Sequence, residues 1–435
     1  MSVRPGAAFD PSALLQSAFT AAVHAADPLS CMRGQLPPPP KGRTLVVGAG
    51  KAAASMAAAV EAQWPADAPL SGLVITRYAH GLDLLRIRCV EAGHPVPDDA
   101  GERAAQEILK AVGELGPDDL LLALVSGGGS SLLSLPAEAI PMSDLQAVTK
   151  ALLRSGAPIT DMNIVRKHLS RIQGGRLALA SRAPVRALVI SDVVGDDPSA
   201  IASGPCSADP SRFQDAVEVL ARWSVEPPAS VRAYLQAGCR GEVPETPKPG
   251  DPRLSHATTV LVATARASLE AAAAVFRAQG IRVLNLGDAV TGEARDVASA
   301  MASWVRELAG DRDPSIPRPV VLLSGGECTV TVRGSGRGGR CTEFLLALGL
   351  AVEALGVREQ VHALAADTDG IDGVSPYAGA WLTPETLGRA RSAAREPSTC
   401  LDANDGLAVF EPLGQVVKTG PTRTNVNDFR AILIT

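Results

Sequence analysis

Residues 44–61 read TLVVGAGKAAASMAAAVE, and this stretch decides the fold class. An apolar run typical of a buried strand comes first, a glycine turn follows, and the alanine-rich remainder is typical of a helix. Gly48, Gly50 and Ala53 match the G-x-G-x-x-A spacing of a dinucleotide-binding turn. Lys51 lies inside that turn, where its ammonium and the helix dipole together favour an anion. A nicotinamide site, an anion site and a plain tight turn all stay open at this point.

The same alternation of apolar runs and helical patterns continues along the chain. The runs that predict buried strands in the first half are TLVVG, GLVIT, IRCVEAG, LLLALVSGGG and RALVISDVVG. This alternation predicts an α/β fold with a doubly wound parallel sheet. A polar, proline-rich stretch at 241–256 lacks periodicity and predicts a domain boundary. We therefore expect an N-terminal Rossmann-like domain over 1–245 and a smaller C-terminal α/β domain over 256–435.

Composition limits the classes of function. The chain has 435 residues, 46% of them hydrophobic and 20% charged, which is typical of a globular protein of two domains. A net charge of -5 and only 3% aromatic residues argue against nucleic-acid binding and favour a small-molecule ligand. The 7 cysteines include no C-x-x-C pair, which suits a reducing compartment. No apolar run reaches transmembrane length and no signal peptide is evident, so we expect a cytoplasmic protein without a membrane partner, either monomeric or homodimeric.

A glycine-rich run directly follows one predicted strand, within LVSGGGSSLLSLP at 124–136. Such a run exposes several backbone N–H groups and hydroxyls, which together form a cradle for phosphate oxygens. Three adjacent glycines cost backbone entropy, which favours function over a flexible loop. The expected nucleotide-binding residues are Ser126, Gly127, Gly128, Gly129 and Ser130.

Charged residues flank this run in the sequence. Asn163, Arg166 and Lys167 share one face at helical spacing, as a ligand-binding face or as a solvated basic face. Asp192 comes just past a predicted strand and Asp197 lies in the loop that follows. These carboxylates could hold Mg²⁺, Asp192 could accept a hydroxyl proton, or the loop carboxylates could only cap turns.

The second half repeats the pattern of a strand followed by Ser-Gly-Gly, in LLSGGECTVTVRGSGRGGRCTEF at 322–344. Gly325 and Gly326 are further expected nucleotide-binding residues, and Glu327 follows them. A strand of alternating Thr and Val is expected next, and Arg340 then begins a helix, the best anion-binding position among three arginines. Asp369 lies after a further strand, where it could bind Mg²⁺ or substrate hydroxyls.

Eight segments in order resemble the glycerate 2-kinase family, the class II glycerate kinases with a C-terminal MOFRL domain. They are VVGAGKAAASMA, EAGHPVPDDAG, LVSGGGSSLL, NIVRKHLSRIQGGRLA, SDVVGDDPSAIASGP, LLSGGECTVTVRGSGRGGR, DTDGIDG and TGPTRTNVNDF. The resemblance implies ATP-dependent phosphorylation of D-glycerate to 2-phosphoglycerate with Mg²⁺, in a cleft between two α/β domains. The lysine and arginine that the family places in its active site correspond to Lys51 and Arg340.

Our leading hypothesis is therefore a kinase that acts on glycerate or a close sugar acid. Lys51, Asp192 and Arg340 are the expected catalytic residues. Substrate contacts are expected from Asn163, Arg166, Lys167 and Glu327, the carboxylate pairing with Arg340 or with the segment near Arg166, and metal contacts from Asp192, Asp197 and Asp369.

Two alternatives stay open. The first is an NAD(P)H-dependent hydroxypyruvate reductase, a name often attached to members of the family. The second is a sugar-acid-binding protein with altered or lost kinase activity. It is motivated by Cys341 and Thr342, which replace two amide side chains of the family pattern.

Overall fold

The computed structural model describes residues 9–310 and 318–435, which divide into two compact units. The N-terminal unit is Pro28–Ala263 with Arg423–Asn425. The C-terminal unit is Thr264–Thr422 with Val426–Thr435, and it includes the first helix of the chain. Within the described ranges, no helix combines the length and the apolar character needed to cross a membrane.

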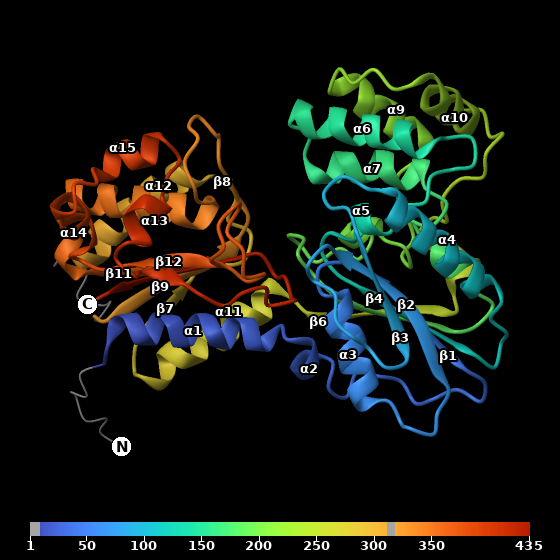
Figure 1. Cartoon of the computed structure of the whole chain (residues 1–435), viewed down its shortest axis with the longest axis horizontal. Coiled ribbons are helices and arrows are strands. Elements are labelled where there is room, and N and C mark those ends of the chain that lie inside the picture. Colours follow the sequence, from blue (N-terminus) through green and yellow to red (C-terminus); the bar gives the residue numbers. More distant parts are fainter. Residues whose placement is uncertain (1–8, 311–317) are drawn as a thin grey trace. The chain divides into compact units, whose positions relative to one another are not determined.

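A six-stranded parallel sheet forms the centre of the N-terminal unit (Figure 1). Its strands are β1 (Thr44–Ala49), β2 (Leu70–Arg77), β3 (Ile87–Ala92), β4 (Leu120–Val125), β5 (Val185–Ile190) and β6 (Ala257–Ala263). The order β3-β2-β1-β4-β5-β6 is that of dinucleotide-binding sheets. Every residue of β1 and β4 is buried, as expected for strands covered by helices on both faces. The predicted doubly wound parallel sheet is confirmed for this unit.

The helices of the N-terminal unit fall into two groups. Around the sheet lie α2 (Pro28–Cys31), α3 (Ala53–Gln63), α4 (Asp99–Gly113), α5 (Gly129–Leu132) and α8 (Arg176–Leu179). The second group has an apolar core of its own and consists of α6 (Met142–Ser155), α7 (Ile159–Leu169), α9 (Phe213–Arg222) and α10 (Ala229–Cys239). Figure 1 shows this group gathered beside α5. Short 3₁₀ turns occur at Ile201–Ser203 and Pro252–Leu254.

The sheet of the C-terminal unit is mixed, with the order β13-β12-β11-β14-β9-β7. Its strands are β7 (Arg282–Asn285), β9 (Val320–Gly326), β11 (Val361–Asp367), β12 (Gly379–Leu382), β13 (Val416–Val417) and β14 (Asp428–Ile434). Only β7 and β9 run parallel, because β14 enters between β9 and β11 in the opposite direction. A separate two-residue ladder joins β8 (Gly292–Glu293) to β10 (Cys328–Thr329).

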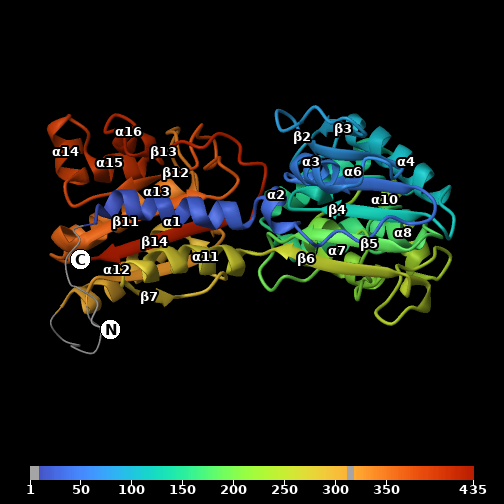
Figure 2. The same cartoon turned by 90° about the horizontal axis from the view of Figure 1, so that it is seen from below.

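Helices cover both faces of this mixed sheet (Figure 1), and Figure 2 looks onto one of these faces through its helices. One face packs on α1 (Pro11–Ala25) and α11 (Ala265–Ala278), and the other on α12 (Ala294–Ala309) and α13 (Arg340–Ala354). The remaining helices are α14 (Thr386–Ser392), α15 (Pro397–Asp402) and α16 (Leu407–Phe410), with a 3₁₀ turn at Arg358–Gln360. Alternation along β14 explains the layers, since Phe429, Ala431 and Leu433 face α1 and α11 while Ile432 and Ile434 face the other core.

Three features differ from the arrangement expected from the sequence. β6 pairs in parallel with β5, so it closes the first sheet although it lies beyond residue 256. Helix α1 buries its apolar stripe against α11 in the C-terminal unit, although its residues fall within 1–245. The expected Thr/Val strand is reduced to β10, since residues 330–332 form no ladder.

Candidate functional site

The carboxyl edge of the parallel sheet carries the polar residues that the sequence singles out. Lys51 follows β1, Ser126 follows β4 and Asp192 follows β5, and parallel strands bring these three ends to one edge. The backbone N–H of Lys51 donates to the carbonyl oxygen of Gly127 at 2.8 Å. The N–H of Ala52 donates to Ser126 Oγ at 3.0 Å. The turns after β1 and β4 are thus tied into one structural element.

The glycines after β4 lie where a side chain would collide with neighbouring residues. A Cβ on Gly127 would lie 1.8 Å from Asp192 Oδ2, so this carboxylate lies directly over the Gly127 backbone. Asn425 Nδ2 donates to the same oxygen at 3.4 Å. Gly128 has φ +80°, and a Cβ there would lie 3.0 Å from the His94 ring. In the described residues, the N–H groups of Gly127 and Gly128 donate to no acceptor, which favours a phosphate cradle beside the lysine.

Helix α7 connects to this edge through a chain of hydrogen bonds. Asn163 Nδ2 donates to the carbonyl oxygen of Ala200 at 3.1 Å. Asn163 Oδ1 accepts from Ser203 Oγ at 3.1 Å and from Arg166 Nη1 at 3.3 Å. Ser203 Oγ also approaches Ser130 Oγ at 2.9 Å. These hydrogen bonds therefore join two predicted substrate-binding residues, Asn163 and Arg166, to the predicted nucleotide-binding run.

Lys167, the third residue expected on that face, is occupied elsewhere. Its Nζ donates to Asp209 Oδ1 at 2.6 Å, and both side chains are buried. Burial raises the pKa of Asp209, but the charge and hydrogen bond of Lys167 outweigh this and lower the pKa overall. This pairing occupies the Lys167 ammonium inside the N-terminal unit, and it does not support the substrate contact expected from the sequence.

In the C-terminal unit, Arg340 begins α13 and is surrounded by carboxylates. Its guanidinium donates to Asp428 Oδ1 at 2.7 Å, to Asp367 Oδ2 at 2.8 Å and to Glu327 Oε1 at 2.5 Å. Burial alone would lower the pKa of Arg340, but these carboxylates raise it above the ordinary value. Arg430 Nη2 donates to Asp428 Oδ2 at 2.8 Å. Three carboxylates thus face two guanidinium groups, which disfavours the expected pairing of Arg340 with a substrate carboxylate.

Gly325 and Gly326 lie inside β9 and do not form a turn beyond it. The N–H of Gly325 donates to the carbonyl oxygen of Gly287 at 2.8 Å, and its own carbonyl accepts from the N–H of Val290 at 3.2 Å. A Cβ on Gly326 would lie 2.3 Å from the carbonyl oxygen of Val290. These glycines admit a neighbouring segment of backbone to the strand, and their geometry does not support the expected nucleotide contact.

The three expected metal ligands are divided between the two units. Asp192 belongs to the N-terminal unit and Asp369 to the C-terminal unit, where the Asp369 carboxylate accepts from the N–H of Ile371 at 2.9 Å. Asp197 accepts from the N–H and the hydroxyl of Ser199, both at 2.8 Å. Within the described ranges, no group of three His, Cys, Asp or Glu side chains is arranged to hold a metal ion.

Cys341 and Thr342, which depart from the family pattern, are both fully buried at the start of α13. The N–H of Cys341 donates to Asp372 Oδ1 and the N–H of Thr342 to Asp372 Oδ2, each at 2.9 Å. Thr342 Oγ1 donates to the same carboxylate at 2.9 Å. Burial raises the pKa of Asp372 to about 6. The two replacements therefore belong to the N-terminal cap of a helix.

Several residues of these clusters were not singled out by sequence reasoning. His94 and Asn425 lie in the quoted segments EAGHPVPDDAG and TGPTRTNVNDF, and Asp428 lies in the second of these. The apolar run AILI at 431–434, with polar residues on either side, would have been the signal for a further strand. Arg430 carried no such signal, because a buried arginine inside a strand does not follow the apolar pattern.

Two family models match the chain. Residues 14–236 match a domain described as a domain of unknown function, DUF4147, and residues 320–428 match the MOFRL family. A protein of Agrobacterium vitis with the provisional name hydroxypyruvate reductase is 50% identical over 424 residues, which cover 97% of this chain and 94% of that protein.

Proteins named as kinases are also similar over most of their length. The glycerate 2-kinase of Pyrococcus horikoshii is 37% identical over 398 residues, which cover 91% of this chain and 88% of that protein. The crystal structure of the glycerate kinase of Thermotoga maritima aligns with a TM-score of 0.85 and 35% identity, covering 98% of this chain and 99% of that one. The family resemblance and the two-unit α/β fold predicted from the sequence are both confirmed.

Proposed function

We propose that this chain, which belongs to the glycerate 2-kinase family, transfers the γ-phosphoryl group of ATP to the 2-hydroxyl of D-glycerate. The observation that carries the proposal is the glycine run after β4, with Lys51 bound to its backbone and Asp192 over Gly127. Phosphoryl transfer requires mainly positioning and neutralisation of charge, and these groups supply both. Release of ADP from MgATP on addition of D-glycerate tests the proposal directly.

The glycine run binds the nucleotide phosphates. The N–H groups of Gly127 and Gly128, unused within the described residues, donate to phosphate oxygens. Lys51 neutralises the negative charge that develops on the transferred group. Lys51→Ala therefore lowers turnover by about 100-fold or more while the chain stays folded, since removal of one charge-stabilising donor has this effect in enzymes. Full turnover in this variant would exclude the role.

Mg²⁺ fits the residues of this edge through a single carboxylate. Mg²⁺ takes one or two protein carboxylates and completes its shell with substrate phosphates and water. Asp192 offers such a carboxylate over the Gly127 backbone, beside two N–H donors that are unused within the described residues. The ion supplies charge neutralisation on the phosphates when bound. We therefore assign Asp192 to the metal and not to the proton of the hydroxyl, and a loose transition state requires little assistance from a base.

A reductase is the second candidate, supported by the sheet order and by the name carried by the relative from Agrobacterium vitis. A nicotinamide cofactor needs an acidic residue at the end of β2 for its ribose, and β2 ends at Arg77. An arginine there suits the 2′-phosphate of NADPH, so NADPH and hydroxypyruvate are the reagents for the test. Oxidation of NADPH without release of ADP in the parallel kinase assay would favour the reductase.

The third candidate function is a sugar-acid-binding protein without kinase activity, and the burial of Cys341 and Thr342 weakens the reason for considering it. Cys341 and Thr342 are buried against Asp372 and cap a helix, so their difference from the family pattern does not remove exposed amides from a ligand. D-Glycerate that binds without ADP release would still support that function.

A further inference from the structure

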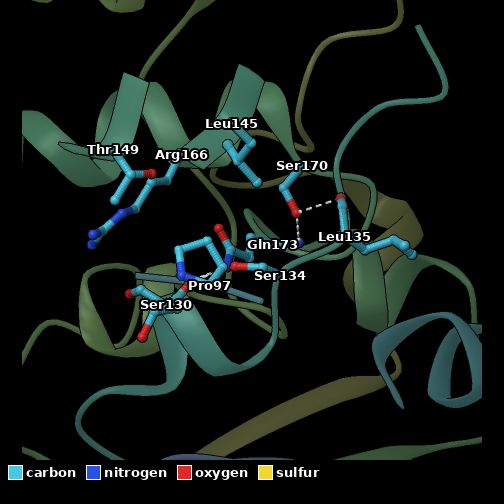
Figure 3. A pocket seen from close by; sticks show the side chains of 10 residues that line it. Pro97, Ser130, Ser134, Leu135, Leu145, Thr149, Arg166, Ser170 and Gln173 are labelled. Carbon is cyan, nitrogen blue, oxygen red and sulfur yellow. Dashed lines mark hydrogen bonds between the residues drawn. The ribbon is translucent and has the colours of Figure 1, made fainter. Parts of the chain in front are cut away.

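A small pocket lies beside the glycine run, under helices α6 and α7 (Figure 3). Its volume is about 10 Å³, which is room for one water-sized group. Figure 3 shows Thr149 and Arg166 side by side on the two helices, with Ser130 below them. The residues of the lining that matter here are Pro97, Ser130, Leu145, Thr149 and Arg166.

Arg166 brings a charge into this pocket that the described residues do not neutralise. The residue is only 9% exposed, and within the described part of the chain its side chain makes one hydrogen bond, from Nη1 to Asn163 Oδ1 at 3.3 Å. No carboxylate of the described residues pairs with it, whereas the adjacent Lys167 has Asp209. Burial lowers the pKa of Arg166 to about 10, which means that removal from water disfavours the charged form of the guanidinium. A buried cation of this kind is stabilised by an anion.

We propose that this pocket receives one oxygen of the carboxylate of a short 2-hydroxy acid, with Arg166 as the main partner and Thr149 as a second donor. The inference rests on the proposed kinase function, and it answers which arginine holds the substrate carboxylate. Arg340 is already bound by three carboxylates, whereas most donors of the Arg166 fork are unused in the described residues.

The surroundings favour a carboxylate over a phosphate group. The guanidinium fork matches carboxylate and phosphate oxygens alike, so the size of the pocket decides. A volume of about 10 Å³ admits one oxygen of a planar carboxylate but not a tetrahedral phosphate group. Pro97 and Leu145 form apolar walls, which lower the local dielectric and strengthen the ion pair. The cavity is narrow, and Ser130 at its edge belongs to the glycine run that we assign to phosphates. In an acid anchored here, the C2 hydroxyl lies one bond closer to the carboxylate, and so to this pocket, than the C3 hydroxyl does.

The test compares Arg166→Met with Arg171→Met as a matched control. Arg171 lies five residues further along, has a side chain that is 37% exposed, and pairs with Glu138 at 3.1 Å. We expect Arg166→Met to raise the Kd for D-glycerate by calorimetry, and its KM, about 100-fold, while the KM for ATP is unchanged. Thr149→Val should raise the Kd about tenfold, and Arg171→Met should leave both constants unchanged.

Thermal unfolding separates ligand binding from a structural role. Replacing an unpaired buried cation by an apolar chain should keep or raise the unfolding temperature of Arg166→Met without ligand. D-Glycerate should raise the unfolding temperature of the wild type and of Arg171→Met, but not that of Arg166→Met. A large fall in the unfolding temperature of ligand-free Arg166→Met would instead show a structural role and overturn the inference.

The outcomes distinguish this inference from the proposed function. If Arg166→Met binds D-glycerate within threefold of the wild type, or loses ATP affinity instead, the inference is overturned. If the wild type releases no ADP but binds D-glycerate, and Arg166→Met loses that binding while Arg171→Met keeps it, the pocket stands and the kinase function fails. Absence of D-glycerate binding to the wild type overturns the inference as well.

Discussion

Gly127→Ala is the sharpest perturbation of the site, because it places one methyl group under the Asp192 carboxylate. The new Cβ would lie 1.8 Å from Asp192 Oδ2 and 2.4 Å from its Cγ. Ordinary contact begins at 3.4 Å, so the carboxylate must move by about 1.6 Å, the difference between 3.4 and 1.8 Å. Gly127 is not among the residues with positive φ, so alanine introduces no backbone strain there. A displacement of about 1 Å can cost about 100-fold in rate, and we expect kcat to fall by at least that factor.

Stability should change little, because Asp192 is a side chain that can rotate out of the way. We expect the free energy of unfolding to fall by no more than about 1 kcal/mol, as for most substitutions outside the core. The assay is MgATP-dependent ADP release with saturating D-glycerate, run beside thermal unfolding.

The matched control is Gly113→Ala near the end of α4, where a Cβ would have nothing within 4 Å. It should keep full activity and gain a few tenths of a kcal/mol or more from helix propensity. A folded Gly127→Ala with wild-type kcat would refute the assignment of Asp192 to the reaction.

Other perturbations have equally definite outcomes. Asp192→Asn should lower kcat, and the loss should shrink as Mg²⁺ is raised; a loss independent of Mg²⁺ would contradict the metal role. Lys167→Met should destabilise the protein by about 3 kcal/mol in chemical denaturation, because it leaves the Asp209 carboxylate buried without its partner, and an unchanged midpoint would contradict a structural pairing. Burial raises the pKa of Glu245, but hydrogen bonds from His168 and from two backbone N–H groups outweigh this and lower it to about 2. This carboxylate therefore stabilises the folded state above its ordinary pKa and loses that effect as the pH falls toward 2. The stability difference between wild type and Glu245→Gln should be ~1 kcal/mol near neutral pH after solvent screening and should shrink below pH 4; a difference independent of pH would contradict this.

The N-terminal sheet could be predicted because its signals are local. Each strand from β1 to β5 is a short apolar run that ends at glycine or polar residues, and helical patterns separate the runs. Residues that follow such strands must gather at one edge, so the neighbourhood of Lys51, Ser126 and Asp192 followed from topology alone.

The mixed sheet of the C-terminal unit depends on pairings that are distant in sequence. β14 pairs antiparallel with both β9 and β11, and no local pattern specifies which strands it enters between. For the same reason the partners of Arg340 were not predicted, since Asp428 lies 88 residues away along the chain. The burial of Lys167 is a further example, because Asp209 approaches it from a loop 42 residues later.

Two similar sequence patterns also proved structurally different. Ser126-Gly127-Gly128 lies beyond the end of β4 and forms a turn, whereas Ser324-Gly325-Gly326 lies inside β9. Both segments read Ser-Gly-Gly, but Gly325 and Gly326 pair with β14 and therefore belong to a strand. A glycine run after apolar residues therefore predicts a close approach, but it does not identify whether a ligand or another backbone segment approaches.

The central claim is the transfer of a phosphoryl group to the 2-hydroxyl of glycerate, and the product is its most direct test. Purified wild-type protein would be incubated with MgATP and D-glycerate, and the products followed by phosphorus NMR. Our account predicts ADP and 2-phosphoglycerate in equal amounts, both reduced in Gly127→Ala. A 3-phosphoglycerate product would contradict the proposed regiochemistry, and unchanged ATP in the presence of D-glycerate would contradict the kinase function itself.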